Sequence, residues 1–324
     1  MTLRTRLTEQ LGIEHPIMSA PMAMHSGGRL AAAVSRAGGL GSFGGIHRNE
    51  GPDWVRRQIQ LVRTQTEHPF GIGFISAFIP LYEQHFEAAL AERVPVVALS
   101  FGDFEPWLGK AKAANARVMC QVQTMASARA AVDGGADILI AQGNEAGGHT
   151  GTMNLLPLLV SLIEAFPDVP VLAAGGIASG RALAAVLAAG GDGAWVGTGF
   201  LATHECTEVS DEYKRLIIAS DGEDTVFTRA YDIVGGAPWP NGIGERVRRN
   251  AFTDEWQNRD DEVLAKRKEI AAELARSSDP DRSAILFGQS AGAIHAIRPA
   301  ADVVHEICSE AERILRAQIA RLLS

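Results

Sequence analysis

The stretch VPVLAAGGIASGRALAAVLAAGG, Val169 to Gly191, contains one complete strand, turn and helix unit. Its first six residues are all apolar, as is typical of a strand buried on both faces of a parallel sheet. Ser179 stands where a helix N-cap is expected, and the alanine-rich run that follows ends at Gly190 and Gly191. Serine favours helix starts and glycine favours helix ends, so the stretch predicts a β-strand joined to an α-helix by a glycine-rich turn.

The same unit recurs along the first two thirds of the chain. Seven other short apolar runs are expected to be strands: PIMS from Pro16, LGSFG from Leu40, FGIGFI from Phe70, VPVVAL from Val94, RVMCQV from Arg117, DILIA from Asp137 and GAWVG from Gly193. Amphipathic, alanine-rich stretches of helical periodicity lie between them. Eight such units in about 200 residues predict an α/β fold, a closed (β/α)8 TIM barrel. Periodicity alone is also compatible with an open, doubly wound sheet.

The alternation of strands and helices stops after residue 205. Residues 206–287 contain charged helical patterns and few strand signals, so we expect a smaller helical insertion or lid domain. It would lie between the barrel, residues 1–205, and a C-terminal loop and helix, residues 288–324, that returns to the barrel. Within the insertion, GERVRRN from Gly244 is short and surrounded by acidic residues, which favours a solvated face over an anion site.

Composition favours an enzyme-sized protein that acts on small molecules. The 324 residues are 46% hydrophobic, which suffices for a large core. Thirty Lys and Arg against 38 Asp and Glu give a net charge of −8. The chain therefore carries no basic field that would attract nucleic acid or anionic lipid.

The cysteines and the hydrophobic runs indicate the cellular compartment of the protein. The three cysteines are far apart, which predicts reduced thiols. The N-terminal residues lack the apolar core of a signal peptide, and the most hydrophobic run, residues 155–166, is too short to span a bilayer. We expect a cytoplasmic protein with no membrane partner, for which a homo-oligomer is an open alternative.

Three motifs suggest chemistry that their context does not support. GLGSFG, residues 39–44, matches GxGxxG but follows a helix and leads into a strand, so we expect a helix end and turn. GQSAG, residues 288–292, matches the serine nucleophile motif. A hydrolase built on Ser290 stays an alternative, although Asp302, Glu306 and His305, which would have to complete it, are all expected on one terminal helix. HEC, residues 204–206, has no second cluster at zinc-like spacing, so no metal site is expected.

The stretch AQGNEAGGHTG, residues 141–151, stands at the carboxyl end of the sixth expected strand. Barrels assemble their active sites at that end. Gly147 and Gly148 lack side chains where a planar ring would need close backbone approach, and Gln142 supplies hydrogen-bonding groups. His149 can exchange protons near neutral pH, which suits a general acid or base. Taken alone, the stretch is also compatible with an ordinary turn that contains a histidine.

Two further glycine-rich loops follow the seventh and eighth expected strands. They are AAGGIASG from Ala173 and VGTGF from Val196. In barrels these two loops commonly bind a phosphate through backbone N–H groups and a helix N-terminus. We assign the phosphate contacts to Gly175, Gly176, Gly197 and the hydroxyl of Thr198. A phosphorylated cofactor across the barrel mouth follows; flavin mononucleotide (FMN), a sugar phosphate or pyridoxal phosphate would each satisfy these residues.

In these blocks the chain resembles the nitronate monooxygenases, a family formerly called 2-nitropropane dioxygenases. The similar blocks, in the family's order, are PIMSAPMA, AAAVSRAGGLGSFGG, AQGNEAGGHTG, AAGGIASG, VGTGF and GQSAGAIHAIRPAADVV. The resemblance covers nearly the whole chain. It implies a TIM barrel with a helical second domain over its mouth, non-covalent FMN, and His149 as the catalytic histidine. It also makes GQSAG a loop near the flavin, which removes the nucleophile role from Ser290.

The resemblance also implies which residues contact the flavin. The backbone from Ala20 through Pro21 to Met22 would border the isoalloxazine ring. Gln142 and Gly147 would contact the flavin as well. Its phosphate would be bound by Gly176, Gly197 and Thr198.

The reaction implied is oxidation of an alkyl nitronate by O2 to a carbonyl compound and nitrite, without an external reductant. His149 would attract the nitronate as an imidazolium, or remove the α-proton of a neutral nitroalkane as a base. An FMN-dependent NAD(P)H reductase of the same superfamily, for enoyl-acyl-carrier or quinone substrates, is the alternative. Family members often have an asparagine in the block of Gly73 and an arginine where Thr150 stands. These departures bear on the substrate more than on the flavin fold.

Overall fold

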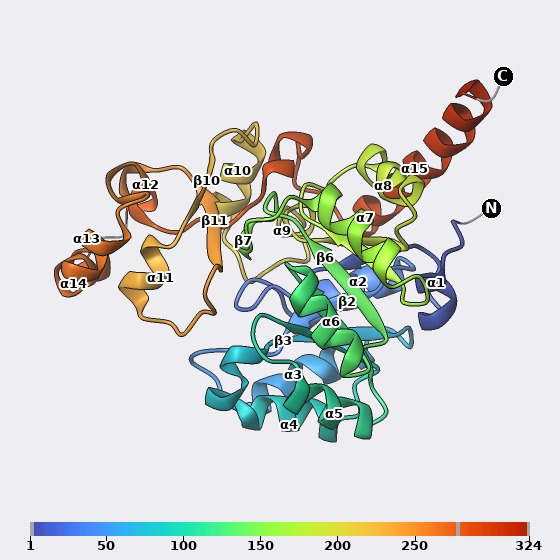
Figure 1. The fold of residues 1–324 in the computed structure, drawn as a ribbon, viewed down its shortest axis with the longest axis horizontal. Helices are drawn as coiled ribbons and strands as arrows, with labels where there is room; N and C mark the ends of the chain where they lie inside the picture. The colour runs from blue at the N-terminus through green and yellow to red at the C-terminus, as the bar shows by residue number, and fades with distance from the viewer. Residues whose placement is uncertain (1–2, 277–278, 323–324) are drawn as a thin grey trace.

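A parallel barrel forms the body of the protein. The computed structural model describes residues 3–276 and 279–322. Eight strands pair in parallel in the order β1-β9-β8-β6-β5-β4-β3-β2, and a bridge between Met18 and Leu40 links the two edge strands into a nearly closed barrel (Figure 1). The barrel strands are β1 Ile17–Ser19, β2 Gly41–Gly44, β3 Phe70–Ile75, β4 Val96–Ser100, β5 Arg117–Val122, β6 Ile138–Gln142, β8 Val171–Ala174 and β9 Gly193–Val196. All eight strands expected from the sequence are confirmed, and the doubly wound alternative is wrong.

Helices flank the barrel strands: the first precedes β1, the last follows β9, and the others connect successive barrel strands. They are α1 Arg6–Leu11, α2 Gly28–Arg36, α3 Pro52–Arg63, η1 Ser76–Leu81, α4 Glu83–Ala91, α5 Glu105–Ala113, α6 Met125–Asp133, α7 Leu155–Ala165, α8 Gly180–Ala188 and α9 Thr198–Leu201. The Ser179 side chain accepts a hydrogen bond from the Ala182 N–H, as expected of the N-cap. GLGSFG follows α2 and leads into β2, so its expected role as a helix end and turn is confirmed.

Two apolar layers lie on either side of the barrel wall. The inner layer includes Met18, Met119, Ile140 and Trp195. The outer layer is formed by residues of the opposite strand faces and of the surrounding helices, and Phe74 is one of its largest buried members. Continuous apolar strands supply both layers, which is why the strand runs show no polar alternation.

Residues after the barrel form mixed structure rather than helices alone. The elements are α10 Asp211–Ala219, β10 Thr225–Thr228, α11 Ala230–Gly235, β11 Gly244–Arg248, α12 Ala251–Trp256, α13 Asp260–Ala265, α14 Arg267–Arg276, η2 Pro280–Arg282, η3 Gln289–Ala293 and α15 Ala300–Leu322. Strand β11 pairs antiparallel with β10 and with β7, Gly148–Thr150. The sequence did not predict this three-stranded sheet. Helices α11 to α14 lie together at one side of the molecule, where α11, α12, α13 and α14 share a separate apolar cluster (Figure 1).

The segment GERVRRN differs from its prediction. It contains β11, and Glu245 and Arg246 are only 4% and 6% exposed. The Arg246 guanidinium donates to the backbone oxygen and the side-chain oxygen of Asn144. The expectation of a solvated face is therefore wrong for this strand, because β11 lies between β7 and β10.

The last helix packs back on the barrel, as expected. Gly180, at the start of α8, donates its N–H to Glu310 of α15, and the α15 residues Val304 and Ile307 are buried in the outer layer. The far end of α15 projects beyond the body of the molecule (Figure 1). No described helix combines the length and the apolar character that crossing a bilayer requires. The three cysteines are buried and unpaired.

Candidate functional site

His149 lies in β7, directly after the loop that follows β6. Gly148 has a φ of +72°, a conformation that glycine adopts without strain, and it turns the chain from this loop into β7. The Gln142 side-chain amide donates to the His149 carbonyl oxygen at 2.9 Å, and the Thr150 hydroxyl donates to the Gly143 carbonyl at 3.0 Å. These bonds fix the backbone of His149 at the carboxyl end of the barrel.

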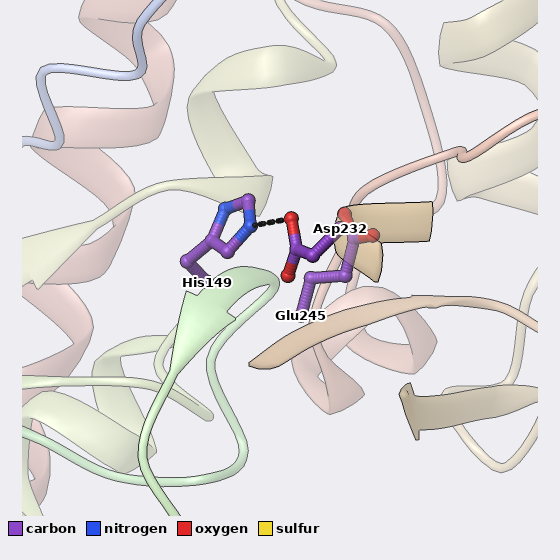
Figure 2. Close-up of side chains that lie close together, drawn as sticks. All are labelled: His149, Asp232 and Glu245. Atoms are coloured by element: carbon purple, nitrogen blue, oxygen red, sulfur yellow. Dashed lines mark hydrogen bonds and ion pairs between the residues drawn. The ribbon is translucent and has the colours of Figure 1, made fainter. Parts of the chain in front are cut away.

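The imidazole of His149 is held by a carboxylate from α11. Nε2 donates a hydrogen bond of 2.9 Å to Asp232 Oδ1, and the two side chains are only 18% and 14% exposed (Figure 2). A carboxylate only accepts hydrogen bonds, so Nε2 carries the hydrogen and Nδ1 of the neutral ring keeps its lone pair. The Asp232 charge also stabilises the imidazolium. This arrangement suits His149 to accept a proton at Nδ1.

Glu245 adds a second carboxyl group beside the hydrogen-bonded pair of His149 and Asp232. It is the register partner of His149 across the β7–β11 pair, and ligand-type atoms of His149, Asp232 and Glu245 all lie within 4.8 Å of one another (Figure 2). Burial and, next, the charge of Asp232 raise the pKa of Glu245 to about 8 against the opposing charge of Arg48. Near neutral pH the Glu245 carboxyl is therefore mainly protonated.

An aromatic cluster covers one face of the His149 ring. The Trp239 ring stacks on the imidazole with centroids 3.5 Å apart and planes 15° from parallel. Phe78 in η1 and Phe101 directly after β4 lie against Trp239 at centroid distances of 4.8 and 5.4 Å. The stack therefore excludes water from that face of the ring.

The residues predicted to bind the cofactor gather at the same end of the barrel. A Cβ on Gly197 would lie 3.6 Å from Met22 Sδ and 3.7 Å from Ala20 Cβ, so the loop after β1 lies beside the loop after β9. Gly175 has a φ of +102°, and a Cβ there would lie 2.9 Å from the Ala146 nitrogen. The loops after β1, β6, β8 and β9 thus form one continuous rim.

The C-terminal loop closes this rim. The Gly288 N–H donates to the Thr198 hydroxyl at 3.0 Å, and a Cβ on Gly147 would lie 2.3 Å from the carbonyl carbon of Phe287. GQSAG is therefore near Gly147 and Thr198, as the resemblance implies. Two histidines follow Ser290. Among the described residues, His295 is exposed and makes no hydrogen bond to Ser290, and His305 packs against His15 just before β1, at the opposite end of the barrel. The part of the chain that the structure describes therefore contains no serine hydrolase triad at Ser290.

The glycine rim fits an anionic group. Within residues 3–276 and 279–322, no hydrogen bond leaves the backbone N–H groups of Gly176, Gly197 or Thr198. Free N–H groups in a glycine turn and at a helix start bind phosphate well. Gly176 is exposed with a φ of +70°, and a Cβ there would meet only the Glu145 side chain. The residues present therefore suit the phosphate of a cofactor such as FMN.

Pro21 explains one departure from the family pattern. A Cβ on Gly73 would lie 2.2 Å from Pro21 Cγ, so the loop after β1 rests directly on this glycine of β3. An asparagine side chain at this position would displace Pro21. Thr150 is buried, and its hydroxyl is already bonded to Gly143.

Three residues of the site escaped the sequence analysis: Asp232, Trp239 and Glu245. All lie in the segment that was expected to be helical, and the chain distance to His149 hides their proximity. One signal was available, because the β-branched run TVFT, residues 225–228, follows a turn-forming DGED and is typical of a strand.

Comparison with known proteins identifies the family. The family model described as nitronate monooxygenase matches residues 4–78 and 74–310. A probable nitronate monooxygenase of Staphylococcus aureus (strain Newman) is 32% identical over 272 residues, 70% of this chain and 76% of its own length.

Two other matches have different names. The (3aS,4S,5R,7aS)-5-hydroxy-7a-methyl-1-oxo-octahydro-1H-indene-4-carboxyl-CoA dehydrogenase of Rhodococcus jostii (strain RHA1) is 36% identical over 231 residues, 71% of this chain. The match spans only 64% of that enzyme's length, a little less than two thirds. The structure of FabK from Thermotoga maritima superposes with a TM-score of 0.87 and 33% identity, covering 99% of this chain and 100% of that one.

The mouth of the barrel carries a histidine that is hydrogen-bonded to a carboxylate, together with a rim of glycine-rich loops. The family model matches almost the full length of the chain. The relatives with enzyme names are a monooxygenase and a dehydrogenase, both oxidoreductases. The chain is an oxidoreductase that belongs to the nitronate monooxygenase family.

Proposed function

We propose that this protein is an FMN-dependent nitronate monooxygenase, which oxidises alkyl nitronates with O2 to a carbonyl compound and nitrite. The observation that carries the proposal is the bond between His149 Nε2 and Asp232, which leaves a base at Nδ1 beside the glycine rim. The family match and the probable nitronate monooxygenase of Staphylococcus aureus support the substrate class.

Binding follows from the rim residues. Gly175, Gly176, Gly197 and Thr198 would hold the FMN phosphate with backbone N–H groups and one hydroxyl. The loop Ala20–Met22, Gln142 and Gly147 would border the ring system. When bound, FMN supplies two-electron acceptance from the substrate and electron transfer to O2.

The chain's own residues handle charge and protons. His149 accepts a proton at Nδ1 from the carbon next to a nitro group, and the electron pair of that C–H bond stays on the substrate as a nitronate. The imidazolium so formed is stabilised by Asp232 and attracts the nitronate anion. Trp239 keeps bulk water from the ring face, which strengthens both interactions.

An anaerobic mixing experiment tests this proposal. We expect propyl-2-nitronate to bleach the flavin absorbance of the purified protein, whereas NADH leaves it unchanged. The His149→Ala variant should bleach about 100-fold more slowly or worse, because it loses the imidazolium that attracts the nitronate anion, and one positioned donor of this kind contributes about that much. His204→Ala, which removes an exposed loop histidine, is the matched control and should behave as wild type. A colourless protein, or bleaching by NADH alone, would refute the proposal.

The second candidate is an FMN-dependent NAD(P)H reductase acting on acyl thioesters or quinones. The dehydrogenase relative, whose name specifies a carboxyl-CoA substrate, favours it. Rapid bleaching by NADH or NADPH, followed by reoxidation with an enoyl thioester, would select this function over the first.

A further inference from the structure

Two carboxylates stand behind His149, and each has one buried oxygen without a partner. Among the residues that the structure describes, none bonds to Asp232 Oδ2 or Glu245 Oε1. In Figure 2 the Asp232 carboxylate lies between the His149 ring and the Glu245 carboxylate. Glu245 is only 4% exposed. Two ionised carboxylates this close in a buried site repel each other strongly, so one of them retains a proton.

The surroundings of Glu245 do not supply a strong counter-charge. The titratable and charged groups that face it are His149 on β7, Asp232 and Tyr231 on α11, Tyr213 on α10, and Arg48 in the loop after β2. Its strand neighbour Arg246 is bonded to Asn144 instead. Arg48 is exposed, so its charge is screened by solvent. Burial, and next the charge of Asp232, therefore raise the pKa of Glu245 to about 8 despite Arg48.

We propose that Asp232 and Glu245 share one proton, and that this carboxylic acid and carboxylate pair sets the charge of the His149 group through the Asp232–His149 hydrogen bond. Glu245 is then a positioning residue that acts through Asp232. With one shared proton, the pair carries a single negative charge, which the imidazolium balances. Without it, the pair would carry two negative charges and would repel an anionic substrate. This role in turnover rests on the proposed function, whereas the shared proton itself does not.

Infrared spectroscopy of the protein tests the shared proton without any substrate. At neutral pH we expect wild type to show the C=O stretch of a buried protonated carboxyl group, and this band should disappear as the pH rises through about 8. The band should be missing from Glu245→Gln and retained in Glu262→Gln, a control that neutralises an exposed glutamate on α13. A wild-type spectrum without the band, or a band that persists in Glu245→Gln, overturns the proposal. The pH titration of this band in wild type tests the shared proton even if a variant does not fold.

The pH dependence of anaerobic flavin reduction by propyl-2-nitronate tests the role in turnover. In wild type the rate should fall as the pH rises above about 8, when the pair takes on its second charge. In Glu245→Gln this fall should disappear or move by more than about one pH unit. The same fall in both proteins overturns the role.

A null result from the nitronate itself has a separate meaning. If propyl-2-nitronate fails to reduce the flavin at any pH, the proposed function is wrong and the shared proton is judged by the infrared result. Asp232→Asn adds a further discriminator, since it removes the carboxylate that fixes the His149 tautomer. The rate at neutral pH should then drop by about 100-fold or more in Asp232→Asn, a larger loss than in Glu245→Gln. Equal losses in both variants would mean that the two carboxylates act only as a structural unit, which contradicts the proposal.

Discussion

Replacing Gly147 by alanine should separate the C-terminal loop from the rim of the site. The new Cβ would lie 2.3 Å from the carbonyl carbon of Phe287 and 2.4 Å from the Gly288 nitrogen, where ordinary contact begins at 3.4 Å. One backbone segment must therefore move by about 1 Å, because neither contact is the end of a flexible side chain. Such overpacking costs about 1–3 kcal/mol.

The displacement also weakens hydrogen bonds that join the loop to the barrel. The Gly288 N–H donates to Thr198 at 3.0 Å, and the Gln289 N–H donates to the Glu145 carbonyl at 3.0 Å. Each such bond contributes about 1 kcal/mol. We therefore expect Gly147→Ala to lower the free energy of unfolding by about 2–4 kcal/mol, with loss of bound flavin because Thr198 lies at the disturbed contact.

The neighbouring glycine is the matched control. A Cβ on Gly148 would meet only Leu286 Cδ2 at 3.6 Å, so its cost comes from the positive φ alone, about 1–2 kcal/mol. Urea unfolding measures the free energy of unfolding of both variants, provided that the slope m of the transition is the same as in wild type. Gel filtration followed by an absorbance spectrum measures how much flavin each variant retains. If Gly148→Ala is the more destabilised of the two, or if Gly147→Ala unfolds as wild type does, the loop contact does not have the importance given to it here.

Three more outcomes follow from the site. Trp239→Ala should make His149 several-fold more reactive towards diethyl pyrocarbonate, as followed by mass spectrometry, because the stacked ring is removed; an unchanged rate would contradict the stack. Gly73→Asn should lower stability by about 1–3 kcal/mol in urea unfolding, because its side chain must displace Pro21, and a neutral effect would show that this loop repacks freely. Glu245→Gln should be more stable than wild type by a few kcal/mol at about pH 9, at about 1.4 kcal/mol for each pH unit, and the difference should vanish towards pH 4.5. The sign follows because the pKa of Glu245 is higher in the folded protein than in the unfolded chain. The contribution of the protonated Glu245 side chain to the stability of wild type is therefore complete below the unfolded pKa and is lost as the pH rises through about 8. Equal dependence of the free energy of unfolding on pH in both proteins would refute this prediction.

The barrel could be predicted from the sequence because its strands are buried on both faces. Continuous apolar runs such as VPVLAA leave a periodic signal, and the helix caps at Ser179 and Thr124 mark the boundaries between elements. The glycine loops could be placed for the same reason, since the order of the strands fixes which loops share the barrel mouth.

The proton-handling part of the site could not be predicted in this way. Glu245 and Arg246 are charged residues inside a short strand, and local pattern alone predicts that charged residues are exposed. They are buried because β11 lies between β7 and β10, a tertiary pairing that no local window contains. Asp232 was missed because a single aspartate in a six-residue helix has no periodic signature.

The pairing of β7 with β11 determines which segments of this protein can be separated without loss of the site. His149 belongs to the barrel by its place in the chain, whereas Asp232 and Glu245 are supplied by the later segment, and one strand pair joins the two. A truncated barrel that ends near residue 205 would keep the glycine rim and the histidine but lose both carboxylates. Grafting the barrel loops onto another scaffold would therefore transfer the glycine rim and His149 without the carboxylates that orient the imidazole, and a working transplant has to include the three-stranded sheet and α11.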